Sequence, residues 1–225
     1  MKTIMEKVSD KELRESVLRH LEWDPEIGSQ DISVKTDEGV ATLTGFVHSY
    51  AEKVAAEKAA KSVYGVKIVA NDIDVKPTTR TDPEIARDAV EAMRLDMRVP
   101  DDCIKAGIRE GWVTLEGTVE WNYQREAADS CVRKLYGVRG VTNKIEVKPK
   151  VSANKVSTNE VRAKIEEALR RSAGVDARRI AVSAQDGVVT LHGNVRSWLE
   201  KEEAARAAWA APGVTVVVDH TAVVP

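Results

Sequence analysis

Three stretches of the chain share one alternation of hydrophobic and polar positions. The segments are DEGVATLTGFV at 37–47, REGWVTLEGTV at 109–119 and QDGVVTLHGNV at 185–195. Alternation of this kind is typical of a strand that buries one face. A second alternating run lies shortly before each segment, and the first glycine of each segment marks a turn between the two runs. The pattern therefore predicts a strand hairpin in each stretch.

The same register extends far beyond these hairpins. An aliphatic residue lies 26 positions before each of the anchor glycines Gly39, Gly111 and Gly187, and a Gly-Val pair lies 26 positions after each. The chain thus contains three 69-residue copies of one unit, aligned without a gap. A unit of this length is the size of a small domain and is too long for one turn of a solenoid. The sequence predicts three domains, at 9–77, 81–149 and 157–225.

Each unit opens and closes with recognisable signals. A Ser or Thr precedes a glutamate by three positions, which is the capping box that begins a helix. The pairs are Ser9 with Glu12, Thr81 with Glu84, and Ser157 with Glu160. Hydrophobic residues follow at helical spacing, then come the hairpin, an alanine-rich helix and a third alternating run. A proline closes each unit, at Pro77, Pro149 and Pro225.

These elements predict an α+β fold in which two helices cover one face of a three-stranded mixed sheet. A helix that connects two strands favours a parallel pairing of the second and third strands. A glycine at Gly45, Gly117 and Gly193 interrupts or ends the second strand of each unit. A missing side chain at such a position indicates a bulge or a close approach of backbone.

The combined pattern resembles the BON domain family, the bacterial osmotic-stress and nodulation-associated domain. It consists of G-V-x-T-L-x-G-x-V, then alanines, a G-V pair and the ending N-x-I-x-V. The asparagine of that ending is Asn71 in the first unit and Asn143 in the second, whereas the third unit has Asp219. The resemblance implies a non-enzymatic module of envelope maintenance and stress tolerance that contacts phospholipid or holds assemblies together. It supplies no catalytic residues.

Composition narrows the possible partners and compartments. The chain has 34 Lys and Arg against 36 Asp and Glu, so no surplus of positive charge favours nucleic acid. As written, it shows neither an apolar stretch long enough to span a bilayer nor a signal peptide, which predicts a cytoplasmic protein. A periplasmic or membrane-peripheral location is the alternative if an export signal was removed. Cys103 and Cys131 have no metal-binding spacing and are predicted to be reduced thiols.

The chain contains no known catalytic signature. Phosphate loops, HExxH zinc motifs, GxSxG elbows and Cys/His clusters are all missing from the sequence. Gly137-Val-Arg-Gly140 matches the GxxG of RNA-binding KH modules, but the other two units lack the second glycine. We therefore expect no enzyme, no cofactor, no metal and no nucleic acid partner.

Cations occupy positions where helices usually carry acidic residues. Lys53, Arg125 and Lys201 fall in the first turn of the second helix of each unit, where the helix dipole favours anions. Pairing four residues on would explain Lys53 with Glu57 and Arg125 with Asp129. Lys201 has no acidic residue at that spacing.

Aromatic residues accompany these cations. Open backbone donors, a cation and an amphipathic ring together suit a lipid phosphate or an acidic partner surface. The alternative is that the rings pack on their own domains. The predicted lipid- or partner-binding residues are Trp121, Tyr123, Arg125, Tyr50, Lys53, Trp198 and Lys201, and the second unit is the first place to look.

The leading functional hypothesis is a non-enzymatic binding or scaffold protein that contacts phospholipid membranes or envelope-associated partners in stress tolerance. The alternative is a structural module that associates with itself or with other proteins and binds no lipid. The valine-rich run VTVVVDHTAVV at 214–224 motivates this alternative, because an exposed strand edge can pair with another chain.

Overall fold

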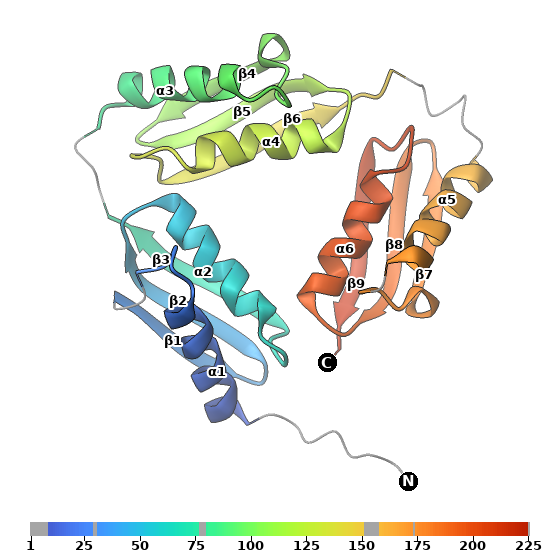
Figure 1. The fold of residues 1–225 in the computed structure, drawn as a ribbon, viewed down its shortest axis with the longest axis horizontal. Helices are drawn as coiled ribbons and strands as arrows, with labels where there is room; N and C mark the ends of the chain where they lie inside the picture. Colours follow the sequence, from blue (N-terminus) through green and yellow to red (C-terminus); the bar gives the residue numbers. More distant parts are fainter. Residues whose placement is uncertain (1–8, 29–30, 77–79, 151–157, 173, 225) are drawn as a thin grey trace.

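The computed structural model describes residues 9–28, 31–76, 80–150, 158–172 and 174–224. Within these ranges the chain repeats one helix-strand-strand-helix-strand unit three times (Figure 1). Each unit is α+β and contains one three-stranded mixed sheet with two helices. The predicted fold class and element order are confirmed.

The elements have closely matching bounds in the three units. The first unit contains α1 (Asp10–Trp23), β1 (Ile32–Asp37), β2 (Val40–Val47), α2 (Tyr50–Ser62) and β3 (Ile68–Val75). The second contains α3 (Asp82–Leu95), β4 (Ile104–Arg109), β5 (Trp112–Val119), α4 (Asn122–Arg133) and β6 (Gly140–Val147). The third contains α5 (Thr158–Arg171), β7 (Ile180–Gln185), β8 (Val188–Val195), α6 (Trp198–Trp209) and β9 (Val216–Val223).

Each sheet has its hairpin on one side and its crossover strand on the other. The strand order is β1-β2-β3, with β1 antiparallel and β3 parallel to the central β2. In this register Leu43 lies between Val34 and Asn71. The other two sheets repeat the order and the directions. The predicted parallel pairing of second and third strands is confirmed.

The core of each unit forms between the helices and one face of the sheet. In the first unit the helical stripe of Leu13, Val17 and Leu21 is buried beside Leu43. The central leucine has no exposed surface in any unit, at Leu43, Leu115 and Leu191. The alternating and helical patterns of the sequence therefore mark the buried faces.

A two-residue turn joins the hairpin strands. Glu38 and Gly39 both have positive φ, at 48° and 88°. Such pairs suit the turns whose twist matches that of the flanking strands. The equivalent pairs are Glu110 with Gly111 and Asp186 with Gly187.

The second glycine of each hairpin lies against the backbone of its neighbour strand. A Cβ atom on Gly117 would lie 2.1 Å from the carbonyl oxygen of Cys103, and φ at Gly117 is 146°. Gly45 and Gly193 would place a Cβ atom 2.0 Å from the carbonyl oxygens of Asp31 and Arg179. The close backbone approach predicted from the sequence is confirmed.

Capping boxes begin the first helices. Ser9 Oγ accepts from the Glu12 N–H at 3.3 Å, and the Glu12 carboxylate accepts from the Ser9 N–H at 3.1 Å. In the second unit the Glu84 carboxylate accepts from both the N–H and the hydroxyl of Thr81 at 2.8 Å. The predicted cap Ser157 and the closing prolines Pro77 and Pro225 lie outside the described residues.

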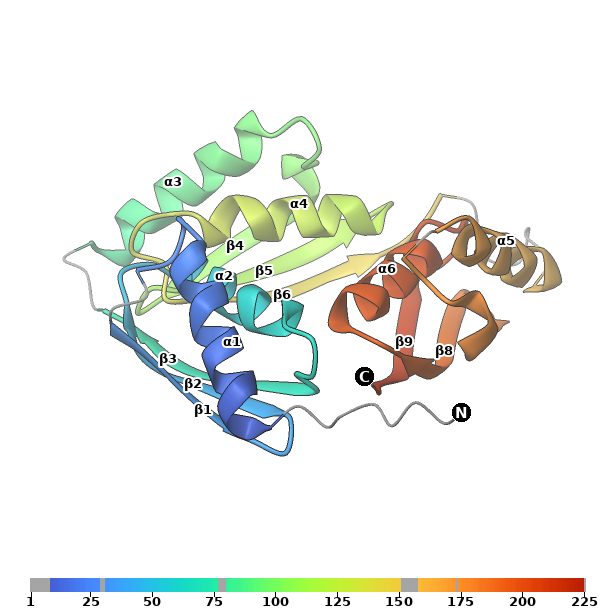
Figure 2. The same cartoon turned by 60° about the horizontal axis from the view of Figure 1, so that its bottom comes forward.

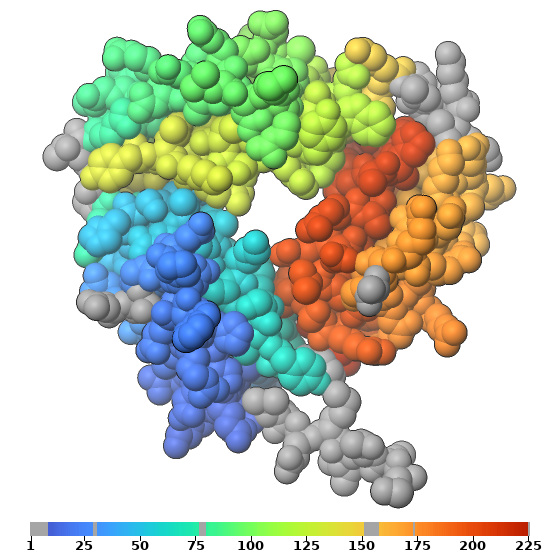
Figure 3. All heavy atoms as spheres, in the orientation of Figure 1, coloured from blue at the N-terminus to red at the C-terminus, as the bar shows by residue number. Residues whose placement is uncertain are grey.

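The three domains form a ring with the second helices on its inner side. Figures 1 and 2 show α2, α4 and α6 near the middle, and α2 and α6 contact each other directly. The space-filling view shows an opening between the three domains (Figure 3). The inner position of these helices brings residues of different domains together.

Strand β9 lies at the edge of its sheet and pairs with β8 alone among the described strands. Val216 is 45% exposed there. Self-association through this edge stays a prediction.

Candidate functional site

A buried carboxylate fixes the start of α2. Glu52 Oε1 accepts from the Gly28 N–H at 2.6 Å, and Oε2 accepts from the His48 N–H at 2.8 Å. Ser49 Oγ accepts from the Glu52 N–H at 3.2 Å and caps the helix. The carboxylate therefore ties the loop after α1 to the loop before α2, which a capping box alone does not do.

The third domain repeats this arrangement and the second modifies it. Glu200 accepts from the Asp176 N–H at 2.8 Å and from the Arg196 N–H at 2.6 Å. In the second domain the equivalents of Glu200 and Asp176 are Gln124 and Pro100. Proline has no N–H to donate, so a second acceptor oxygen has no purpose there. The paired change was visible in the sequence once the repeats were aligned.

Arg125 contacts the third domain. Its guanidinium lies 4.7 Å from the centre of the Trp209 ring, which also packs on the cores of the second and third domains. Burial there lowers the pKa of Arg125. Asp129 forms its close ion pair with Arg133 one turn further on, and it interacts with Arg125 only through their charges.

The predicted partner of Lys53, Glu57, makes its close contacts with other residues, although the charge of Lys53 also acts on it. Glu57 forms its ion pair with Lys61 at 2.5 Å and accepts from Asn71 Nδ2 at 3.3 Å. Burial acts to raise the pKa of Glu57, but these bonds hold that pKa below its usual value. Asn71 Nδ2 also donates to the backbone carbonyl of Lys53 at 3.0 Å, so the asparagine joins β3 to α2.

The third domain makes the same connection with a different pair. Asp219 cannot donate a hydrogen bond as Asn71 does, because a carboxylate only accepts. Lys201 instead reaches across to β9, where its ammonium lies 3.4 Å from Asp219 and donates to the Thr221 carbonyl at 2.5 Å. The cation that lacks a partner along its own helix finds one on the neighbouring strand.

The aromatic residues beside these cations divide into two groups. Tyr50 packs against the cores of the first and second domains. The Trp198 ring lies 4.9 Å from the ammonium of Lys61 in the first domain and 5.8 Å from that of Lys201.

Trp121 and Tyr123 remain open to solvent, with 40% and 54% of their surfaces exposed. Of the predicted residues, Tyr50, Arg125 and Trp198 contact another domain. Lys53 and Lys201 make their contacts within their own domains, and Trp121 and Tyr123 form one exposed aromatic pair. The residues therefore do not form three equivalent sites.

We expect Arg125→Ala to loosen the third domain. A partly buried cation–π contact contributes about 1 kcal/mol, so its loss should raise the open population roughly fivefold. Small-angle X-ray scattering should then show a larger radius of gyration. Arg162→Ala is the control, because Arg162 pairs with Glu166 within α5. Equal radii for both variants would contradict the contact.

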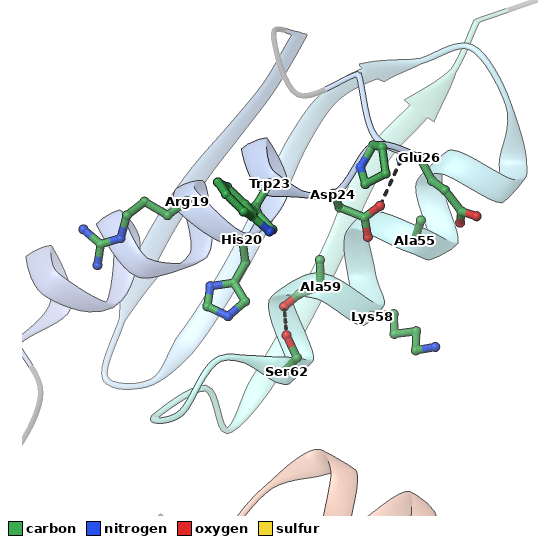
Figure 4. A pocket seen from close by; sticks show the side chains of 10 residues that line it. Arg19, His20, Trp23, Asp24, Glu26, Ala55, Lys58, Ala59 and Ser62 are labelled. Carbon is green, nitrogen blue, oxygen red and sulfur yellow. Dashed lines mark hydrogen bonds between the residues drawn. The ribbon is translucent and has the colours of Figure 1, made fainter.

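A groove on the first domain was not predicted. It has a volume of about 720 Å³ and lies between the end of α1 and the middle of α2 (Figure 4). Trp23, which is 89% exposed, lines the groove together with Arg19 and Lys58. Acidic Asp24 and Glu26 also line it, so its charge is balanced. The only sequence signal was a tryptophan outside the hydrophobic stripe of α1.

The described residues contain no cluster of His, Cys, Asp and Glu that could hold a metal ion. No helix in the described part of the chain is long and apolar enough to cross a membrane. The thiol of Cys131 donates to Asp96 at 3.4 Å, and burial raises its pKa to about 11. Such a thiol stays protonated at neutral pH and is a poor nucleophile.

The repeated unit defines a class of small α+β domain arranged in tandem. The family model described as "BON domain" matches residues 9–77, 81–149 and 157–225. The chain belongs to the BON domain family, as the resemblance of its repeats indicated.

One curated relative is "Osmotically-inducible protein Y" of Escherichia coli (strain K12). The two sequences are 35% identical over 129 residues, which cover 54% of this chain and 64% of that protein. The chain thus matches less than two thirds of the length of this relative.

Two solved structures of CdsD, a structural protein of the type III secretion system of Chlamydia trachomatis, also align. The first is 14% identical to this chain, and the alignment covers 94% of this chain and 91% of that structure. The second is 12% identical, and the alignment covers 97% of this chain and 100% of that structure. The TM-score is 0.28 in both cases. A likeness this weak says nothing about function.

Proposed function

We propose that this BON-domain chain is a non-enzymatic scaffold of the osmotic stress response that contacts phospholipid through Trp121 and Tyr123. The sequence similarity to an osmotically inducible protein supports the stress role. No cofactor, metal or nucleic acid enters the proposal. The exposure of the aromatic pair at the start of α4 is the observation that carries it.

The three starts of the second helices differ in what their aromatic rings do. Tyr50 and Trp198 are half-buried in contacts between domains, whereas Trp121 and Tyr123 face solvent. Amphipathic rings of tryptophan and tyrosine are favoured at the level of lipid headgroups. The second domain therefore has rings free to enter a membrane interface.

Basic residues border this aromatic pair. The Lys148 N–H donates to the Val119 carbonyl at 2.7 Å, and the Lys150 ammonium pairs with Glu120 at 2.5 Å. Both lysines are largely exposed and lie beside the strand end that precedes Trp121. They can exchange their carboxylate partners for lipid phosphates, because exposed ion pairs of this kind are weak.

Vesicles of phosphatidylglycerol and phosphatidylcholine provide the test. We expect the full chain to co-sediment with them at low salt and to bind less as salt rises. The double variant Trp121→Ala with Tyr123→Ala should weaken the apparent affinity by about tenfold, since it removes roughly 1.4 kcal/mol or more of interfacial burial.

Tyr136→Ala is the matched control, because Tyr136 is a 59% exposed aromatic of the same domain that lies beyond the end of α4. It should leave the affinity unchanged. Absence of vesicle binding by the unmodified chain, or equal losses in both variants, would refute the proposal. Loss of binding in Trp23→Ala alone would move the contact to the groove of the first domain and would refute the role of α4.

A further inference from the structure

We propose that the open face of the β4-β5-β6 sheet binds an uncharged oligosaccharide by stacking a sugar ring on Trp112. This face carries no helix, because both helices of the domain lie on the other side of the sheet. The site is separate from the phospholipid contact proposed for the start of α4.

The Trp112 ring is held flat on the sheet. A Cβ atom on Gly140 would lie 2.4 to 2.6 Å from three consecutive carbons of its six-membered ring. Nearly equal distances to consecutive ring atoms arise only when the ring presents its face. The indole Nε1 also donates to Thr142 Oγ1 at 2.8 Å. One face of the ring is therefore fixed against the backbone of β6, and 50% of the residue is exposed.

A trough of small residues runs beside this ring. Gly107 pairs with Thr114, which pairs with Thr142 on the next strand. A Cβ atom on Gly107 would have no neighbour within 4 Å, so the position above it is open. The hollow over this part of the sheet has a volume of about 530 Å³. That is within the usual size of ligand sites.

The rim of the trough carries both signs of charge. Glu116 and Lys144 pair at 3.6 Å on one side, and Arg109 and Glu110 lie on the other. Such a rim offers hydrogen-bond donors and acceptors together without an excess of positive charge. Phosphate backbones need that excess, so the balance favours a ligand of neutral hydroxyl groups.

The other two sheets lack each part of this arrangement. The fold therefore does not require it. At the three positions the first unit has Lys35, Val40 and Ile68, the third has Ser183, Val188 and Val216, and the second has Gly107, Trp112 and Gly140. Gly140 completes the GxxG sequence of the second unit, and its role here is to leave space for the Trp112 ring.

A flat chain fits this surface better than a curved one. β-1,4-linked pyranoses with equatorial substituents form extended ribbons with apolar C–H faces. One ring can stack on Trp112, as apolar faces pack on aromatic rings. Its hydroxyl groups then reach Thr114 and the charged rim. A wide, shallow trough accepts such a ribbon without a deep pocket.

The test is a nuclear magnetic resonance titration of the full chain with tri-N-acetylchitotriose. The chain has five tryptophans, and the indole N–H signal of Trp112 is identified by its loss in Trp112→Val. We expect this signal to shift with saturation at about millimolar ligand. The indole signals of Trp23 and Trp121 should not move.

Gly107→Lys fills the trough with the residue that the first unit has at this position. It should weaken binding by about tenfold, which corresponds to 1.4 kcal/mol. Both substitutions take residues of the sister domains, so unchanged signals elsewhere will verify folding. No shift of the Trp112 signal, an equal shift by curved maltotriose, tighter binding of hexathymidylate, or unchanged binding in Gly107→Lys would overturn the proposal.

Discussion

Gly117→Ala should destabilise the second domain by about 3 kcal/mol, because the added methyl group meets backbone that cannot move aside. The Cβ atom would lie 2.1 Å from the Cys103 carbonyl oxygen, and the residue has a φ of 146° that side chains rarely adopt. Relief would require β4 and β5 to separate. Guanidinium unfolding, with hydrogen exchange measured on peptides of β4 and β5, will report the loss in this domain.

Gly107→Ala is the matched control on the neighbouring strand. Its Cβ atom would meet nothing within 4 Å, so we expect a change within about 0.5 kcal/mol. A loss after Gly117→Ala no larger than that after Gly107→Ala would show that the close approach is not a constraint. Gly45→Ala and Gly193→Ala should repeat the result in the outer domains, where the corresponding distances are 2.0 Å.

Glu200→Ala should cost the third domain about 3 kcal/mol. Glu200 is 4% exposed, and its carboxylate accepts from the backbone N–H groups of Asp176 and Arg196. Removal of the carboxylate leaves these two partly buried N–H groups without an acceptor, and each unsatisfied donor costs about 1 to 3 kcal/mol of stability. Hydrogen exchange should rise first at Asp176 and Arg196, because these amides lose their protection directly.

Two variants separate this effect from a general loss of charge. Glu202→Ala changes an exposed acid of the same helix and should be within about 0.5 kcal/mol of the unmodified protein. Gln124→Glu should bring no stability to the second domain, because Pro100 has no N–H for a second oxygen. Equal losses for Glu200→Ala and Glu202→Ala would contradict the tie between the loops.

The sequence predicted the fold of each unit almost completely. Three aligned copies show that a feature is required by the fold: Gly117 recurs as Gly45 and Gly193, and all three approach a backbone carbonyl. Buried faces were equally clear, because Leu43 and its equivalents keep one position in one alternating run. Repetition removed the ambiguity that a single alternating segment would leave.

The sequence predicted which residue types occur at the starts of the second helices, but it did not predict what those residues contact. Pairing four residues apart did not predict the main contact of Arg125, which is with the ring of Trp209 in another domain. Contacts between domains depend on how the units assemble, and the hydrophobic pattern within one unit contains no information about that assembly. The hydrogen bond from Gly28 to Glu52 spans 24 positions, so it becomes visible only in the folded domain.

Features unique to one unit were the hardest to interpret. Trp112 and Gly140 differ from their equivalents together, but their contact spans β5 and β6 and becomes visible only in three dimensions. Asp219 looked like a lost asparagine until Lys201 was found beside it. In both cases the residue that differs from its equivalents contacts another residue of the same unit.

The aromatic contacts of Tyr50 and Trp209 make the middle domain the hub of the assembly. Each ring touches the core of its own domain and also that of the second. Removal of the first or the third domain would keep one of these two aromatic contacts. Excision of the middle domain would remove both and leave the outer domains to meet through α2 and α6, including the Lys61–Trp198 contact. We therefore expect loss of a unit from this tandem protein to disturb the assembly less at its ends than at its centre.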